Sequence, residues 1–394
     1  MKKLVLIAFI AITQIGFSQT KQTEIRSLLK NVMPLAEKQY VLLNKNTPDT
    51  LMPRNFEPGK NTLNFSDTKW WCSGFFPGTL WYIYEYTKNP EIKKIAEKRL
   101  DELEPQKYFT GNHDLGFMIY CPFGNAYRIT GNKKYVEVIT TAAGSLASRY
   151  RPAIKSIQSW ESNKRLSCPV IIDNMMNLEL LYWAGTHGGD AKFVAIANNH
   201  AMSTIKNHFR DDYSSYHVID YDLSTGKLIK KITWQGANDS SAWSRGQSWG
   251  LYGFTMMYRF TKNKVYLNQA KHIANFLMNV ANQSDDAIPY WDYDAPGIPN
   301  TYRDASAGAV MASALLELAQ YSTKLEKANY IARAEKILLS LGSEKYLSKE
   351  GENGGFLIKH NVGSIPHNSE VDASLTYADY YFLEGLMRYK KWYL

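Results

Sequence analysis

The sequence predicts an all-α fold, an (α/α)6 barrel or six-hairpin toroid with long active-site loops and a small β-like insertion. The strongest indication is the segment 173–184, D-N-M-M-N-L-E-L-L-Y-W-A, which reads as a helix that is apolar on nearly every side. A helix without a polar face is buried in a large core. The second indication is a degenerate repeat of helical hairpins, and the third is the lack of a linker that would divide the chain.

Each copy of the repeat is an apolar helix, a short polar turn and a more amphipathic helix. The apolar helices are predicted at 81–86, 125–129, 180–184 and 252–260, and the amphipathic ones at 92–100, 135–147, 193–205 and 266–280. The segments 309–321 with 330–341, and 377–389, extend the count. The more apolar helices should form an inner ring surrounded by the others.

Six inner helices can be counted, starting near Gly74, Asp114, Asp173, Arg245, Ala305 and Ala373. The stripe of Gly246, Gly250 and Gly253 predicts close packing of one inner helix against a neighbour, because glycine inside a helix costs about 1 kcal/mol against alanine. Pro122 should kink the second inner helix. The β-like insertion is predicted at 216–234 around a Ser-Thr-Gly turn.

The N-terminus reads as a secretory signal peptide over residues 1–18, with Lys2 and Lys3 before an apolar run and a cleavage site near Ser18. No cysteine stands at that point for a lipid anchor, and no segment is long enough for a membrane span. We therefore expect a soluble exported protein, periplasmic or extracellular, with one catalytic domain over residues 19–394. The sequence does not predict the oligomeric state.

Composition narrows the class of partner. The formal net charge is +9, and it falls to +7 without Lys2 and Lys3, which favours an anionic partner. The basic residues are scattered and no nucleic-acid module is present, so nucleic acid is not expected. The 10 Trp and 27 Tyr instead indicate stacking on sugar rings.

The three cysteines are too few for a disulfide framework, and three reduced thiols are favoured over one bridge. Neither the cysteines nor the histidines show metal-ligand spacing, so no metal or cofactor is expected.

Polar and aromatic motifs precede each inner helix, so six helix mouths should converge on one cavity. For Asp304 and Asp372 we favour simple helix capping. For Asp114 and Asp173 we favour catalysis, because two acids on buried apolar helices suit an upward tuning of their pKa values. Arg245 could bind a substrate carboxylate or neutralise one of the aspartates. His217 could equally pack in the core or contact substrate.

These motifs resemble the unsaturated glucuronyl hydrolases of glycoside hydrolase family 88 over nearly all of the chain after the signal. The resemblance rests on several stretches, W-C-S-G-F-F-P-G (71–78), H-D-L-G-F-M (113–118), I-Q-S-W (157–160), D-N-M-M-N-L-E-L-L-Y-W-A (173–184), A-W-S-R-G-Q-S-W-G-L-Y-G-F (242–254), P-Y-W-D-Y-D-A-P (289–296), R-D-A-S-A (303–307) and A-D-Y-Y-F-L-E-G-L (378–386).

The resemblance implies an (α/α)6 barrel that releases a 4,5-unsaturated uronic acid from the non-reducing end of lyase-generated oligosaccharides. In that chemistry water adds across the C4=C5 vinyl ether, and the hemiketal that forms opens and expels the aglycone. The resemblance makes Asp173 the general acid/base and Asp114 its partner. Positions that match the substrate site of the family are His113, His217, Gln235, Trp243, Arg245 and Trp249, with Trp71 and Trp160 as aromatic platforms.

The segment 359–370 matches no sulfate-recognition pattern, so the aglycone stays open among chondroitin, hyaluronan, heparin-type and ulvan fragments. Five residues of that segment could equally contact a sulfated sugar or simply be solvated: Lys359, His360, Ser364, His367 and Ser369.

Three alternative functions differ from this one in the residues that they require. The unsaturated rhamnogalacturonyl hydrolases of family 105 typically have Arg-Gly-Asn-Gly where this chain has Arg245-Gly246-Gln247-Ser248. A non-catalytic exported glycan-binding protein would not need buried acids, and an epimerase on this barrel would need paired histidines.

Overall fold

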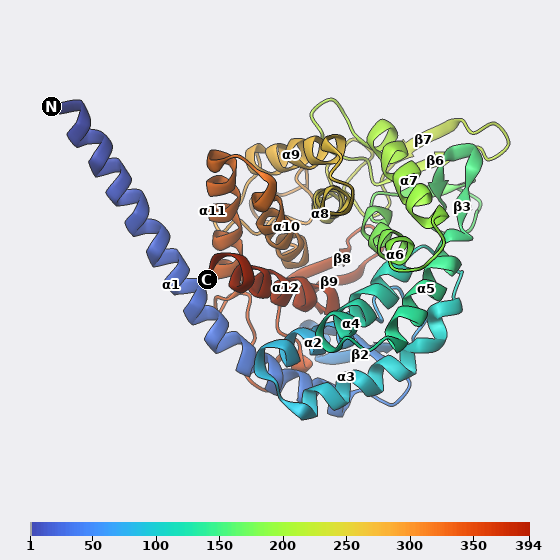
Figure 1. The fold of residues 1–394 in the computed structure, drawn as a ribbon, viewed down its shortest axis with the longest axis horizontal. Helices are drawn as coiled ribbons and strands as arrows, with labels where there is room; N and C mark the ends of the chain where they lie inside the picture. The colour runs from blue at the N-terminus through green and yellow to red at the C-terminus, as the bar shows by residue number, and fades with distance from the viewer. Residues whose placement is uncertain (1) are drawn as a thin grey trace.

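Twelve α-helices, one of them preceded by a π-helix, form two concentric rings in the part of the chain that the computed structural model describes, residues 2–394 (Figure 1). Side chains are described from Thr20 onward, so those of the predicted signal segment lie outside the described residues. The inner ring comprises α2 (Phe75–Thr87), the π-helix η3 (Gly116–Gly124) with α4 (Asn125–Thr130), α6 (Asn174–Thr186), α8 (Ser244–Thr261), α10 (Ala305–Leu318) and α12 (Thr376–Tyr393). The outer ring comprises α1 (Lys2–Asn46), α3 (Pro90–Leu103), α5 (Lys134–Ala147), α7 (Lys192–His208), α9 (Lys264–Asn279) and α11 (Lys324–Leu341).

The inner ring is closed. Each inner helix packs against the next along the chain, and α12 returns to pack against α2. The predicted (α/α)6 barrel is therefore confirmed. Five of the predicted inner helices begin within a few residues of the expected positions.

The sixth inner helix differs from the prediction. It begins at Thr376 instead of Ala373, because Ser369–Leu375 forms strand β9. Asp372 is therefore not a helix cap; its carboxylate lies 2.7 Å from Nδ1 of His360. Asp304 does cap α10, and accepts a hydrogen bond from the backbone N–H of Ser306.

The outer helix α1 closes the ring and was not part of the predicted count. Its buried side chains recur every three or four residues, which is the pattern of a helix with one apolar face; they are Ile25, Leu29, Val32, Met33, Ala36, Tyr40 and Leu43. The α1 helix packs against α2, α11 and α12. The N-terminal segment thus supplies the outer helix of the hairpin whose inner helix is α12.

Close approach between inner helices explains part of the glycine stripe. A Cβ at Gly253 would lie 2.5 Å from Cβ of Met175, so α6 and α8 could not meet there with a larger residue. At Gly250 the nearest atom would be 3.6 Å away, an ordinary contact. Pro122 lies inside the π-helix η3, so the backbone accommodates it by a wider turn.

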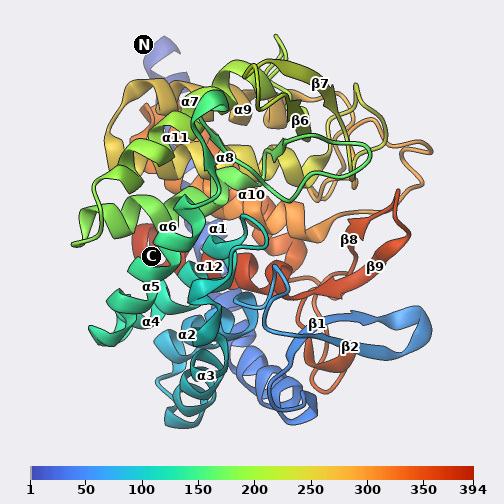
Figure 2. The ribbon, with the colours of Figure 1, turned by 90° about the vertical axis from the view of Figure 1, so that its right-hand side faces the viewer.

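Strands gather on one side of the ring, away from the C-terminus (Figure 2). One antiparallel sheet has the order β2-β1-β9-β8, formed by β1 (Met52–Glu57), β2 (Thr62–Ser66), β8 (Asn361–Ser364) and β9 (Ser369–Leu375). A second sheet has the order β5-β6-β7, formed by β5 (Pro169–Ile171), β6 (Val218–Tyr221) and β7 (Leu228–Ile232). The pair β3 (Tyr150–Arg151) and β4 (Ser156–Ile157) completes the strands of the described residues.

The second sheet contains the predicted β-like insertion. The first sheet was not predicted, and the expected loop 359–370 is largely the hairpin of β8 and β9. Short 3-10 turns connect the remaining segments at Pro58–Lys60, Glu104–Tyr108, Pro152–Ile154, Ala319–Tyr321 and Asn353–Gly355. The strands therefore wall the end of the barrel at which the inner helices begin.

Candidate active site

Asp173 lies at the N-terminus of α6, between strand β5 and the helix. It occupies the N-cap position, but its side chain accepts no capping hydrogen bond, so capping does not explain the residue. The side chain is only 13% exposed. Burial raises the pKa of Asp173 to about 7, against the lowering effects of the Arg245 charge and a hydrogen bond from Trp249. A carboxyl with this pKa can exchange a proton near neutral pH.

Asp114 lies just before the inner π-helix η3, and the structure brings its carboxyl close enough to Asp173 for the two charges to interact. We call the region around Asp114, Asp173, His113 and His217 the catalytic cup. Its side chain is 14% exposed, and Nδ2 of Asn177 on α6 lies 3.5 Å from its Oδ1. Burial and the neighbouring Asp173 charge raise the pKa of Asp114 well above its usual range. Two carboxyls that oppose each other's ionisation are the arrangement expected of an acid/base pair.

His217 immediately precedes strand β6 and faces Asp173. Its Nδ1 accepts hydrogen bonds from the backbone N–H groups of Trp234 (3.2 Å) and Gln235 (3.1 Å). Because an acceptor nitrogen carries no proton, these bonds place the ring proton on Nε2. That nitrogen lies 3.7 Å from Oδ2 of Asp173. Burial lowers the pKa of His217 well below its usual range, so the ring is neutral.

Neither Nε2 of His217 nor Oδ2 of Asp173 has a hydrogen-bond partner among the described residues, although both atoms are buried. Buried polar atoms in proteins are nearly always hydrogen-bonded, so two unsatisfied atoms that lie 3.7 Å apart need an explanation. A donor and an acceptor that point into the same space are suited to hold a reacting group or a water molecule between them.

His113 is the second buried histidine of the cup. Its Nε2 lies 3.4 Å from Oδ1 of Asp114. Burial and the nearby Arg149 charge lower the pKa of His113 to about 3, so this ring is also neutral. Its backbone N–H donates to the carbonyl of Ser159, which ties the segment before η3 to the loop that carries Trp160.

Arg245, in the first turn of α8, is only 1% exposed and is held within the protein. Its Nη1 donates to Oδ2 of Asp304 at 2.5 Å and to the carbonyl of Val362, and its Nη2 donates to the carbonyl of Gly363 at 2.7 Å. Of the two roles weighed from the sequence, the structure shows neutralisation of an aspartate. The guanidinium also anchors strand β8 to the barrel, and its charge still acts on Asp173.

The predicted aromatic residues fall into two groups. Trp243 and Trp249 are buried; Trp243 stacks on His217 at 4.4 Å between ring centroids, and Trp249 packs against Phe117. Trp71 is partly exposed and lies over Tyr377 at 5.0 Å. Trp160 is also partly exposed, with its ring centroid 6.0 Å from that of Trp234.

Gln235 connects the second sheet to the β8–β9 hairpin. Its Nε2 donates to the carbonyl of Gly363 at 2.9 Å, the same carbonyl that Arg245 binds. The hairpin, Gln235 and Arg245 thus form one hydrogen-bonded wall of the cup. His367 in the hairpin turn lies near Trp234, with 5.5 Å between ring centroids.

Three residues that sequence reasoning did not place in the site also contribute. Asn177 is the hydrogen-bond partner of Asp114, Asp304 is the counter-ion of Arg245, and Trp234 extends the aromatic surface of Trp160. Asn177 lies one helical turn after Asp173 on α6, so its position on the same helix face was readable from the sequence. The partnership of Asp304 with Arg245 spans 59 residues and was not.

Among the described residues, no group of three or more His, Cys, Asp and Glu side chains could hold a metal ion. The three cysteines are free thiols, with Cys72 and Cys168 buried and Cys121 partly exposed. No helix within the described part of the chain has the length and apolar character to cross a membrane.

Comparison with known proteins identifies the family of the chain. The family model for Glycosyl Hydrolase Family 88 matches residues 45–392. The chain is 42% identical to an unsaturated glucuronyl hydrolase of Formosa agariphila, over 94% of this chain and 93% of that protein. It is 35% identical to an unsaturated chondroitin disaccharide hydrolase of Streptococcus agalactiae, over 85% of each chain. A crystal structure of an unsaturated glucuronyl hydrolase specific for heparin superposes with a TM-score of 0.90 at 44% identity, over 93% of this chain and 97% of that one.

The match covers most of the chain and includes all the predicted site residues from Trp71 onward. It confirms the predicted family, and it favours family 88 over the related family 105 and over a non-catalytic glycan-binding protein. The chain belongs to glycoside hydrolase family 88 and is a glycosidase of the unsaturated glucuronyl hydrolase type.

Proposed function

We propose that the enzyme removes a 4,5-unsaturated uronic acid from the non-reducing end of an anionic oligosaccharide by hydrating its C4=C5 bond, with Asp173 as the general acid/base. The observation that carries the proposal is the pair of buried, unsatisfied atoms Oδ2 of Asp173 and Nε2 of His217, which face each other across 3.7 Å. The space beside them is the place for the reacting carbons and the attacking water.

The protonation state of Asp173 suits this reaction. Asp173, with a pKa of about 7, donates a proton to C4 while water adds its oxygen to C5 and returns a proton to the Asp173 carboxylate. The product is a hemiketal at C5. Its C5–O bond to the ring oxygen breaks, giving a C5 ketone and a hemiacetal at C1, which releases the aglycone as an alcohol and leaves an aldehyde. The net change is the addition of one water molecule.

Asp114 supports this cycle by remaining protonated. Its pKa is raised further by the Asp173 charge, so it is the weaker acid of the pair and adds no second negative charge to the cup. This matters because the substrate itself carries a carboxylate. A neutral Asp114 can also donate a hydrogen bond to a sugar hydroxyl, as a protonated carboxylic acid does in an apolar site.

We assign neutral His217 the role of a hydrogen-bond donor. Its Nε2–H, fixed by the backbone N–H groups that bind Nδ1, points at Asp173 and at whatever occupies the gap. We assign it to hold the attacking water or the substrate carboxylate next to Asp173. Because both Nη atoms of Arg245 are engaged by Asp304 and the β8 carbonyls, we assign it to attract the uronate through its charge and not as a direct fork.

We assign the aglycone side of the cup to the partly exposed pair Trp160 and Trp234. His367 from the β8–β9 turn lies beside Trp234, and the guanidinium carbon of Arg165 lies 4.8 Å from the centre of the Trp234 ring. Neighbouring aromatic rings beside cationic or neutral donors suit an acidic or sulfated sugar. The related proteins are named for heparin and for chondroitin disaccharides, so a glycosaminoglycan fragment is the proposed substrate class.

The test is an ultraviolet assay that follows loss of the unsaturated-uronate absorbance, using sulfated and unsulfated lyase-generated disaccharides. Asp173→Asn should lower kcat by about 100-fold or more, the usual contribution of a general acid. Asp211→Asn, on an exposed loop aspartate, is the matched control and should leave the rate unchanged. Near-wild-type turnover by the Asp173 variant would reject the assignment.

Export is proposed on the sequence of residues 1–18 alone, with cleavage near Ser18 and a periplasmic or extracellular destination. N-terminal sequencing of the mature protein tests this, and the expected first residue is Gln19. An intact N-terminus in the cytoplasmic fraction would contradict it.

A further inference from the structure

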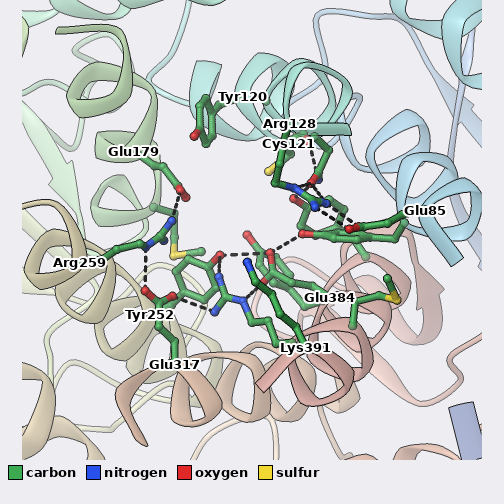
Figure 3. A pocket seen from close by; sticks show the side chains of 18 of the residues that line it. Glu85, Tyr120, Cys121, Arg128, Glu179, Tyr252, Arg259, Glu317, Glu384 and Lys391 are labelled. Atoms are coloured by element: carbon green, nitrogen blue, oxygen red, sulfur yellow. Dashed lines mark hydrogen bonds and ion pairs between the residues drawn. The ribbon is translucent and has the colours of Figure 1, made fainter. Parts of the chain in front are cut away.

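A cavity of about 770 Å³ opens at the end of the barrel opposite to Asp173. Its lining comes from the later turns of the inner helices, including Glu85 on α2, Arg128 on α4, Glu179 on α6, Arg259 on α8 and Glu317 on α10. The candidate catalytic residues lie at the beginnings of the same helices. Figure 3 shows the cavity side chains arranged around an open centre.

An aromatic layer separates the two ends of the barrel. Phe117 packs against Trp249, with 5.2 Å between centroids, and Trp249 packs against Tyr381 at 5.4 Å. Phe117 and Tyr381 line the cavity on one side of this layer, whereas Trp249 hydrogen-bonds to Asp173 on the other. The cavity is therefore a separate space and not a deeper part of the catalytic cup.

Most of the acids in the cavity already have partners. The Glu85 carboxylate binds both Nη atoms of Arg128 at 2.7 and 2.6 Å. The Glu317 carboxylate is paired with Arg259 at 2.7 Å and with Arg388 at 3.1 Å. The Glu384 carboxylate accepts from Tyr82 at 2.8 Å and from Ser313 at 2.5 Å.

The basic side chains exceed the acidic ones. Among the described residues that line the cavity, six are basic and four are acidic. Lys88, Lys390 and Lys391 near the mouth make no ion pair with a described carboxylate; the first two lie over the rings of Tyr84 and Tyr86. A cation near the C-terminus of a helix interacts favourably with the helix dipole, so one basic side chain at each helix end needs no further explanation. The surplus at the mouth of the cavity goes beyond that and favours an anionic occupant.

Several polar atoms around the open centre have no hydrogen-bond partner among the described residues. Nη2 of Arg259 is buried and unsatisfied. The hydroxyl of Tyr120 and the second oxygen of Glu179 also bind no described group, although Glu179 Oε1 accepts from Arg259 at 2.7 Å. A donor, an acceptor and a hydroxyl around one space match a ligand with several hydroxyl groups.

Aromatic residues are the largest group in the walls, with seven tyrosines, two tryptophans and one phenylalanine among the described lining residues. Pockets of roughly 300–1,000 Å³ with aromatic walls and a few convergent polar groups are typical small-molecule sites. We propose that this cavity is a second binding site, at the non-catalytic end of the barrel, for a small acidic sugar such as a uronate monosaccharide or disaccharide.

Cys121 provides a site-specific reporter, because it lines the cavity and is partly exposed, whereas Cys72 and Cys168 are buried. The full-length enzyme is treated with a small thiol reagent, and modification of each cysteine is followed by peptide mass spectrometry. Sodium D-glucuronate at about four times its Kd should slow the modification of Cys121 by about fivefold, as expected from occupancy. D-glucose, which has the same ring without the carboxylate, should protect much less.

Two variants and one control test the assignment. Lys391→Glu removes a cation at the mouth and Tyr120→Phe removes the free hydroxyl, so both should weaken the protection by glucuronate. Lys349→Glu makes the same charge change on an exposed residue outside the cavity and should preserve it. Hydrolysis should proceed at the wild-type rate in all three, because none of these residues contacts the catalytic cup.

Crystals soaked in D-glucuronate should show the sugar between Glu179, Arg259 and Lys391. An unprotected Cys121 together with an empty cavity in the soaked crystal would overturn the proposal. If glucose protected Cys121 as well as glucuronate does, the cavity would not recognise the carboxylate. If Lys349→Glu weakened the protection by glucuronate as much as Lys391→Glu does, the effect would come from the overall charge of the protein and not from the cavity. None of these results would alter the hydrolase function, which is measured separately.

Discussion

Replacing Asp173 by asparagine should stabilise the folded protein while it abolishes activity. The pKa of this carboxyl rises from its ordinary value of 3.8 to about 7 on folding, chiefly because of burial. A raised carboxyl pKa means that the folded state holds its proton more tightly than the unfolded state does. The free energy of unfolding therefore falls as the pH rises above 3.8, and the loss is complete once the pH exceeds about 7.

The size of the effect follows from about 1.36 kcal/mol for each tenfold change in proton affinity. The ionisable Asp173 should cost about 2 kcal/mol at pH 5 and about 4 kcal/mol at pH 8, and Asp173→Asn removes this cost. Guanidinium chloride unfolding of wild type and variant from pH 5 to pH 8 measures the difference. The variant's advantage should grow by about 2 kcal/mol over this range.

The same measurement on Asp211→Asn provides the control, since that side chain is exposed and should show no such growth. An advantage of Asp173→Asn that stays constant with pH would mean that the carboxyl is not buried with a raised pKa. A variant less stable than wild type at pH 8 would refute the reasoning altogether.

Three further outcomes are expected. Since Asp173 must be protonated to act as the acid, kcat/KM should decline as the pH rises through about 7, and a flat profile from pH 6 to pH 9 would contradict its role. Arg245→Ala should lower the free energy of unfolding by about 3–5 kcal/mol, because it leaves buried Asp304 without its counter-ion and removes one donor from each of two β8 carbonyls. A loss below about 1 kcal/mol in urea unfolding would show that the ion pair is dispensable. Activity should survive exhaustive EDTA treatment, because the described residues offer no cluster of metal ligands, and recovery that depends on added metal would reverse this expectation.

The inner helices were predictable because their signal is local. Segments such as 173–184 are apolar on nearly every side, which predicts that they are buried in a large core. The positions of Asp114 and Asp173 followed, since both precede such segments and all inner helices begin at one end of the barrel. The burial that tunes their pKa values was thus inferred from the helices they precede.

The remaining features depend on distant partners. Residues 369–375 show no alternation of burial, with four partly buried side chains followed by three buried ones, and they become strand β9 only because β1 and β8 lie on either side. Arg245 offered two roles in the sequence, and its pairing with Asp304 was decided by the approach of α10 to α8. Likewise, α1 could be recognised as the last outer helix only once α12 and α2 were known to meet.

Two opposing effects act on Asp173, and their magnitudes show which one governs its chemistry. A helix N-terminus stabilises a carboxylate by about 0.3–1 kcal/mol, and by about 2 kcal/mol in favourable buried geometry. Burial prevails over this, since a pKa of about 7 corresponds to about 4 kcal/mol in the other direction. The proton of Asp173 therefore depends on the residues that close the cup, Trp243, Trp249 and His217, and less on α6 itself. Opening that wall would admit water, let the helix dipole and the Arg245 charge prevail, and turn the acid into an ordinary ionised carboxylate at neutral pH.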